Sequence, residues 1–189
     1  SLGVGEPDFP TPEHVREAAI ASIKKGDTKY TDNRGTVELR AAAADYLTKF
    51  DLHYDKQDEI LITMGASEGI DLALRTLVNP GEEVLVAEPS YVSYIPCIEL
   101  CGGVPVSLKL RAENKFRLTR EQLEEKITEK SKVLLISYPN NPTGAIMEKE
   151  DLEAIAEVVK EHDLFVITDE IYAELTYGKK HVSIASLPG

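Results

Sequence analysis

From residue 58 onward, short apolar runs alternate with longer segments in which apolar residues recur every three or four positions. The short runs are typical of buried strands, and the longer spacing is typical of amphipathic helices. Strands are predicted at Ile60–Thr63, Glu83–Ala87, Val104–Leu108, Val133–Ser137 and Phe165–Thr168. Helices are predicted at Ser67–Leu77, Ser93–Leu100, Arg120–Ile127 and Lys149–His162. This alternation predicts an α/β layered domain.

The first fifty residues follow a different pattern. A Pro-rich extended lead (Gly5–Pro12) precedes a predicted helix that begins near Glu13, with Thr11 as its expected cap. A loop (Gly26–Gly35) and a second helix to about Phe50 follow. Because this region lacks the alternation of strands and helices that follows it, we expect it to be an arm or part of a second domain. Further along, the Thr119–Gln122 spacing predicts a capping box.

The charge balance narrows the classes of partner. The chain has 21 basic and 33 acidic residues, a formal net charge of -12, which repels nucleic acid phosphates and anionic lipid surfaces. No apolar run approaches the roughly 20 residues of a spanning helix, and the opening residues are not basic, so we expect a cytoplasmic protein. Cys97 and Cys101 share one helical face, and two thiols lack the other ligands that zinc requires. We interpret them as buried thiols and expect no metal site.

Two candidate segments follow the first two predicted strands, at the sheet edge where open α/β folds bind ligands. Thr63–Gly69 passes through small residues into a helix, whose free N–H groups and dipole favour a phosphate; the alternative is a tight turn without a ligand. Glu88–Tyr91 presents an aromatic ring on which a flat heterocycle can stack, unless Tyr91 is ordinary rim packing.

Two further segments carry polar side chains at strand ends. In Tyr138–Gly144 two prolines bracket two asparagines, which favours a rigid loop that aims an Asn side chain at one place. In Ile167–Tyr172 an apolar strand ends in Asp169, and Tyr172 follows three residues later. A carboxylate there can pair with a protonated ring nitrogen, although acidic strand ends are also common helix caps.

Six motifs together resemble the class I aminotransferases, which have the fold type I of enzymes that depend on pyridoxal 5′-phosphate (PLP). They are Val4–Phe9, Tyr30 before Gly35, Gly65–Ser67, Pro89–Tyr91, Asn140–Gly144 and Asp169–Tyr172, in the family's order and over the whole chain. The match is nearest to the bacterial branch that handles aromatic or N-acylated amino acids. The resemblance implies a mixed, mostly parallel sheet with flanking helices, here incomplete. It also implies an arm and small-domain segment at residues 1–45 and the N-terminal part of the large PLP-binding domain at 46–189.

The resemblance implies a role for each matching residue. Asp169 would hold the pyridine nitrogen protonated, and Asn141 and Tyr172 would donate to the phenolic oxygen of the ring. Tyr91 would stack on the ring, and Gly65, Ala66 and Ser67 would bind the phosphate. Gly5 would line the substrate carboxylate, and Tyr30 would reach the phosphate of the neighbouring subunit's cofactor. We therefore expect a homodimer with a shared site that acts on an amino acid and a 2-oxo acid.

The family's Schiff-base lysine has no match, because it would fall beyond Gly189. No lysine follows Asp169 in a comparable strand-end context; Lys179 and Lys180 lie in a solvated turn. We expect the chain alone to be inactive and to be part of a longer protein. Two strands from beyond that lysine would separate Ile60–Thr63 from the strand at Phe165–Thr168, which predicts a gap in the sheet.

Two other functions remain open. The ring-binding residues are shared by PLP-dependent β-lyases and decarboxylases, in which the substrate contacts select the bond that breaks. Some transcription regulators carry a non-catalytic aminotransferase-like domain behind a DNA-binding segment, and we give this interpretation less weight because nothing basic precedes residue 1 here. The four histidines show no ligand spacing, so no chemistry is predicted for them.

Overall fold

The computed structural model describes residues 5–189, so Val4, which begins the first motif, lies outside the described residues. The chain divides into two compact units between Asn33 and Arg34. The first contains helix α1 (Glu13–Lys25), which ends at Gly26 in the left-handed conformation. The predicted cap was wrong in detail: Pro12 occupies the N-cap position, and the structure shows no side-chain cap bond there.

The second unit begins with α2 (Val37–Leu47), capped by the Thr36 side chain, and the short 3-10 helix η1 (Thr48–Phe50). Arg40 on α2 is buried, and its guanidinium donates to the backbone carbonyls of Gly35, Lys56 and Gln57. These bonds tie α2 to the segment that leads toward the sheet. A buried cation with several carbonyl acceptors recovers much of the hydration that it loses.

Four parallel strands form the sheet of the second unit, in the order β2-β1-β3-β4. They are β1 (Glu83–Glu88), β2 (Val104–Lys109), β3 (Ser131–Ser137) and β4 (Phe165–Asp169), so four of the predicted strands are confirmed within two residues. The apolar runs of β1 and β3 reflect burial on both faces, which is typical of parallel strands, whereas β2 and β4 are only partly buried.

The predicted strand at Ile60–Thr63 was wrong. Residues 60–63 are not assigned to a strand, Leu61 is 51% exposed, and the Ile62 N–H donates to the carbonyl of Arg34. An apolar run becomes a strand only where a neighbour supplies the ladder of hydrogen bonds. Among the described residues the sheet ends at β4, so no continuous sheet joins this segment to β3 and β4.

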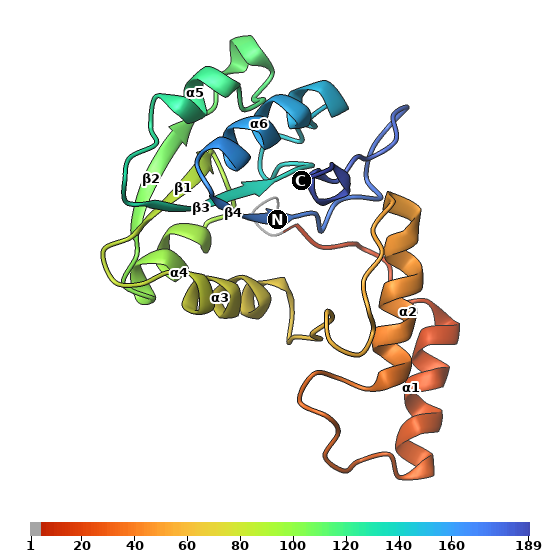
Figure 1. Cartoon of the computed structure of the whole chain (residues 1–189). Helices are drawn as coiled ribbons and strands as arrows, with labels where there is room; N and C mark the ends of the chain where they lie inside the picture. Colours follow the sequence, from red (N-terminus) through yellow and green to blue (C-terminus); the bar gives the residue numbers. More distant parts are fainter. Residues whose placement is uncertain (1–4) are drawn as a thin grey trace. The chain divides into compact units, whose positions relative to one another are not determined.

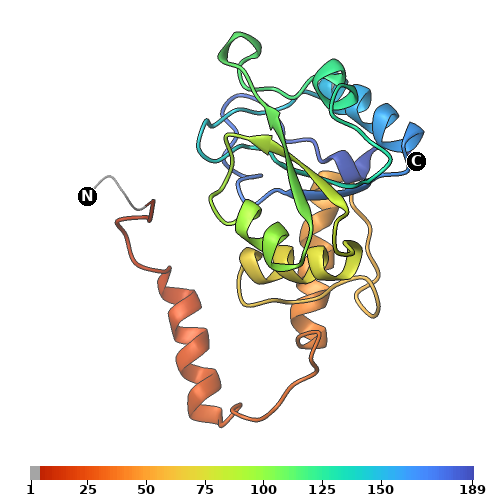
Figure 2. The ribbon, with the colours of Figure 1, turned by 90° about the vertical axis from the view of Figure 1, so that its left-hand side faces the viewer.

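Helices cover both faces of the sheet (Figures 1 and 2). On one face, α5 (Arg120–Glu124), α6 (Lys149–Glu161) and the 3-10 helix η3 (Ile184–Ser186) cover a core that includes Leu85, Leu134 and Ile136. We call this the closed face. On the other, α3 (Ala66–Leu77) and α4 (Tyr94–Leu100) pack on Val84, Val86, Val133 and Leu135. We call this the open face, because the cavity described below lies at its end.

The sequence explains this division. Consecutive strand residues point to opposite faces, so Leu134 and Leu135 enter different cores. The predicted capping box at Thr119 and Gln122 is confirmed, although α5 ends three residues earlier than expected. The short 3-10 helix η2 (Ala112–Asn114) precedes it. Cys97 and Cys101 are free, half-buried thiols packed against the open-face core.

Candidate functional site

A cavity of about 210 Å³ lies where β1, β3 and β4 end at the open face. Its lining residues come from segments spread over a hundred positions of the chain: Ala66, Ser67, Tyr91, Tyr94, Ser137, Asn141, Asp169, Ile171 and Tyr172. Of the residues with a predicted role, Ala66, Ser67, Tyr91, Asn141, Asp169 and Tyr172 therefore meet at one place. The carboxyl ends of parallel strands converge at one sheet edge, which explains this meeting.

The N-terminus of α3 forms one wall of the cavity. Gly65 is its N-cap with φ 87°, a left-handed conformation that favours glycine, although Gly65 itself is not a lining residue. The carboxylate of Glu68 accepts a hydrogen bond from the Met64 N–H and so closes the turn. The first N–H groups of a helix have no partner within the helix, and the helix dipole is positive there. Together with the Ser67 hydroxyl, this wall is suited to a phosphate.

Two tyrosines form the aromatic wall. The rings of Tyr91 and Tyr94 meet edge to face, with centroids 5.7 Å apart. Hydrogen bonds with the side chains of Ser93 and Ser67 lower the pKa of Tyr91 below its ordinary value. Burial, above all, raises the pKa of Tyr94, which is 1% exposed and stays a protonated hydrogen-bond donor.

Asp169 ends β4, and two donors fix its carboxylate. The Tyr94 hydroxyl donates to Oδ2 at 2.7 Å, and the Ile171 N–H donates to Oδ1 at 3.1 Å. A carboxylate can accept about four hydrogen bonds, so acceptor capacity remains on the cavity side. Asp169 is therefore an oriented acceptor for a protonated nitrogen in the cavity.

The two asparagines of the Pro-bracketed loop have different environments. Asn140 is 4% exposed; its Nδ2 donates to the Pro89 carbonyl, and its Oδ1 accepts from the N–H and hydroxyl of Thr143. These bonds shape the loop, whose Tyr138–Pro139 and Asn141–Pro142 peptide bonds are cis. Asn141 instead lines the cavity together with Tyr172. The structure thus separates an asparagine that holds the loop from one that faces the cavity.

Two lining residues with polar side chains were missed at the sequence level, Tyr94 and Ser137. Tyr94 begins α4, and its N–H donates to the Tyr91 carbonyl at 3.2 Å, so one turn brings the two residues to the same wall. Ser137 is the last residue of β3, the position that Asp169 holds on β4. Gly5 and Tyr30 belong to the first unit, whereas every lining residue belongs to the second, so their roles stay predictions.

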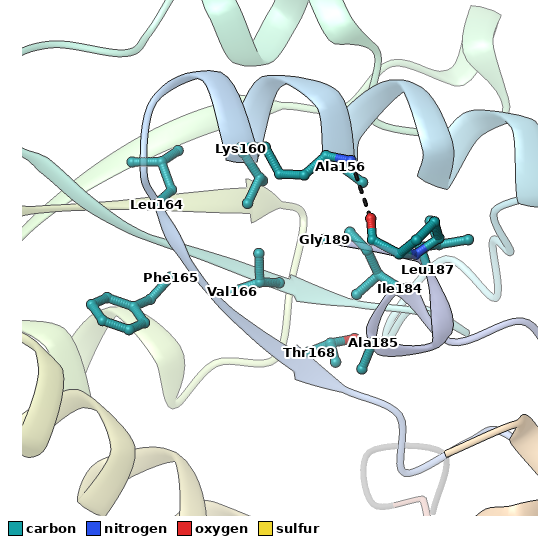
Figure 3. A pocket seen from close by; sticks show the side chains of 12 residues that line it. Ala156, Lys160, Leu164, Phe165, Val166, Thr168, Ile184, Ala185, Leu187 and Gly189 are labelled. Atoms are coloured by element: carbon teal, nitrogen blue, oxygen red, sulfur yellow. Dashed lines mark hydrogen bonds between the residues drawn. The ribbon is translucent and has the colours of Figure 1, made fainter. Parts of the chain in front are cut away.

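Two of the other cavities in the second unit border the site or β4. One of about 430 Å³ shares Asn141 and Tyr172 with the site and extends along Leu175 and Tyr177. The other, about 270 Å³, lies at the closed face between β4, α6 and the chain's last residues (Figure 3). There the Lys160 ammonium donates to the Pro188 carbonyl at 3.1 Å. No residue with a predicted role lines this second cavity.

Comparison with known proteins gives one consistent answer. The family model described as aminotransferase class I and II matches residues 1–188. The chain is 50% identical to the putative aminotransferase YugH of Bacillus subtilis and 46% identical to aromatic-amino-acid aminotransferase 2 of Thermococcus litoralis, in each case over all of this chain and 49% of the relative. It thus spans about half the length of these relatives.

Solved structures give the same picture. An aromatic aminotransferase from Pyrococcus horikoshii matches all of this chain with a TM-score of 0.97 and 45% identity, over 51% of its own length. A mutant of Thermus thermophilus aspartate aminotransferase matches 98% of this chain with a TM-score of 0.94 and 39% identity, again over 51% of its length. The layered α/β fold described above is therefore that of the PLP-dependent aminotransferases over the shared half.

Proposed function

The chain belongs to the class I and II aminotransferase family, and on this premise we propose that its cavity binds the ring and phosphate of PLP. The observation that carries the proposal is the oriented carboxylate of Asp169, which shares one small cavity with Asn141, Tyr172 and the start of α3. We further propose that the whole protein is an amino-acid:2-oxo-acid aminotransferase, a proposal that the names of the similar proteins support.

The residues present fit the cofactor at its ring nitrogen, its phenolic oxygen and its phosphate. Asp169 has an acceptor oxygen for the ring nitrogen, and Asn141 and Tyr172 have donors for the phenolic oxygen. The N–H groups of α3 and the Ser67 hydroxyl suit the phosphate, and the Tyr91 ring offers a face for stacking. The cavity of about 210 Å³ matches the scale of a small heterocycle. The ring nitrogen, the phenolic oxygen and the phosphate of the cofactor thus each have a partner of the right chemistry.

Each of these residues has a distinct task in the proposed reaction. When bound, PLP supplies an electron sink for the pair released as the substrate Cα–H bond breaks. Asp169 keeps a proton on the ring nitrogen because its negative charge stabilises the cationic form. Tyr94 keeps Asp169 aimed by donating to its Oδ2. Asn141 and Tyr172 stabilise the anionic form of the phenolic oxygen by donating to it.

We propose that these 189 residues alone do not complete the site. Transamination requires a lysine amine for two tasks. It binds the cofactor through the carbonyl carbon, and it acts as the base that removes the Cα proton of the substrate. No lysine is among the residues that line the cavity. Borohydride reduction of the chain with PLP should therefore attach no cofactor at a single specific lysine, as peptide mass mapping would record. Stoichiometric attachment at one lysine of this chain would overturn this part of the proposal.

The remaining proposals concern the whole protein. The relatives named above are called aminotransferases, which favours transamination over a β-lyase, a decarboxylase or a regulator. A homodimer in which Tyr30 reaches the partner's cofactor phosphate, a Gly5 contact with the substrate carboxylate, and the domain ranges 1–45 and 46–189 stay proposals based on the resemblance. In the described residues no helix has the length and apolar character to cross a membrane.

A titration of the chain with PLP, in which the quenching of tyrosine fluorescence reports binding, tests the proposal. Asp169→Asn keeps the size of the side chain but removes its charge, so PLP should bind about tenfold more weakly, the size of one charge-assisted hydrogen bond. Asp163→Asn is the matched control, because Asp163 is exposed and its φ of 50° suits asparagine. Equal affinities for the wild type and Asp169→Asn would refute the assignment of Asp169.

A further inference from the structure

A second carboxylate, Glu170, directly follows Asp169 and points the other way. Asp169, the last residue of β4, meets Tyr94 of the open face, whereas Glu170, the next residue, contacts His181 and Ser183 in the segment before η3. The Glu170 side chain is only 17% exposed. A carboxylate in such a position needs hydrogen-bond partners. The proposed function gives Glu170 no role.

Three side chains satisfy Glu170. Its Oε1 accepts from the Ser183 hydroxyl at 2.7 Å and from the Thr168 hydroxyl at 3.0 Å. Its Oε2 lies 2.8 Å from Nε2 of His181. Ser183 is 1% exposed and His181 8% exposed, so these bonds lie in the protein interior, where they are strong. We call Glu170, His181, Ser183 and Thr168 the Glu170 cluster.

Neighbouring groups in turn fix these partners. The His181 ring meets the Phe50 ring edge to face, with centroids 5.4 Å apart, and the Ser183 hydroxyl accepts from the Ala185 N–H at the start of η3. Thr168 belongs to β4 itself. Glu170 therefore connects the end of β4 to η1 and η3. A shift of its carboxylate would break contacts with three side chains.

We propose that Glu170 is a positioning residue for PLP: the Glu170 cluster anchors the turn at residues 169–172 and so holds Asp169 at the ring nitrogen. The inference rests on the proposed function of the cavity. Within this turn the Ile171 N–H donates to Asp169 Oδ1, and the Ala173 N–H donates to the carbonyl of Glu170. An anchor on Glu170 therefore limits the movement of the Asp169 carboxylate.

The decisive test compares PLP with its 1-deaza analogue, in which a C–H replaces the ring nitrogen. A residue that acts through Asp169 affects PLP alone, because the analogue offers Asp169 no nitrogen. Glu170→Gln keeps the size of the side chain but removes its charge and one acceptor facing His181. The ratio of PLP affinity to analogue affinity should fall about tenfold, with analogue affinity unchanged. Glu129→Gln, at an exposed position of the same residue type, should leave the ratio unchanged.

Two outcomes would overturn the inference. Either an unchanged ratio in Glu170→Gln, or an equal loss for both ligands, would show that Glu170 does not act through Asp169. A wild-type chain that binds both ligands equally would instead refute the role of Asp169 in the proposed function, which keeps the two failures distinct.

A readout without cofactor covers that last case and any variant that folds poorly. Thr168→Val keeps the β-branched shape and removes one donor to Glu170. In Thr168→Val and Glu170→Gln, hydrogen exchange at the Ile171 amide should accelerate several-fold, because its acceptor Asp169 becomes mobile. Unchanged exchange in both variants would overturn the proposed anchoring.

Discussion

The two faces of the sheet differ in what their side chains accomplish. On the closed face, apolar residues of β1, β3, α5 and α6 form the larger core, and charged groups at its rim pair with one another. On the open face, a smaller core under α3 and α4 gives way to a cavity with polar and aromatic walls. Because neighbouring strand residues serve different faces, one strand can support stability and ligand binding at once.

The largest expected effect is a loss of stability when a buried side chain of the closed face is shortened. Ile155 on α6 is 0% exposed, and Ile155→Ala should lower the free energy of unfolding by about 3 kcal/mol, since it loses buried methyl groups and leaves a void. The half-buried Val159→Ala should cost less. Urea unfolding measures both. A loss under about 1 kcal/mol for Ile155→Ala would contradict the assignment of this face to stability.

The open face predicts the opposite pattern. Ser67→Ala should change the free energy of unfolding by less than about 0.5 kcal/mol, since Ser67 is exposed at the start of α3. It should weaken PLP binding about fivefold, the size of one hydrogen bond. Pyridoxal, which lacks the phosphate, is the matched control and should bind equally to both chains. A similar loss for both ligands would contradict a phosphate at this helix start.

The smallest effect concerns the charged rim of the closed face. The Lys179 ammonium, followed by Arg117, lowers the pKa of Glu148. A lowered folded pKa gives stability that is present above the ordinary carboxyl pKa and disappears as the pH falls through the folded value. In Lys179→Met the pKa of Glu148 should rise toward the ordinary value, so the acid loss should be smaller and should end at a higher pH.

Urea midpoints measured between about pH 3 and pH 7 test this sign. The difference between the Lys179→Met chain and the wild type should shrink at the acid end and at high salt, because surface ion pairs are screened. The exposed Lys130→Met serves as the control. A difference that grows toward low pH would contradict the assigned pairing.

The sequence allowed prediction of features that depend on local pattern. β1 and β3 have continuous apolar runs because both of their faces are buried, and Asp169 could be identified because it ends the apolar run of β4. Residues 60–63 show a similar run but lack a pairing neighbour, and pairing is a property of the whole sheet. A local pattern cannot distinguish these cases.

The supporting groups of the site depend on distant contacts. Tyr94 matters because its hydroxyl reaches Asp169, 75 positions away. His181 has no ligand spacing in the sequence, yet its ring lies against Glu170 in the folded chain. The residues that would contact the cofactor were therefore easier to predict than the residues that hold them in place.

The ring nitrogen of bound PLP gives the most direct test of the central claim that Asp169 binds it. NMR of PLP labelled with ¹⁵N at the ring, bound to the chain at a pH where the free ring is unprotonated, reports that proton. The account predicts the shift of a protonated ring nitrogen in the wild type and its loss in Asp169→Asn, with Asp163→Asn like the wild type. An unprotonated ring nitrogen in the wild-type complex would contradict it.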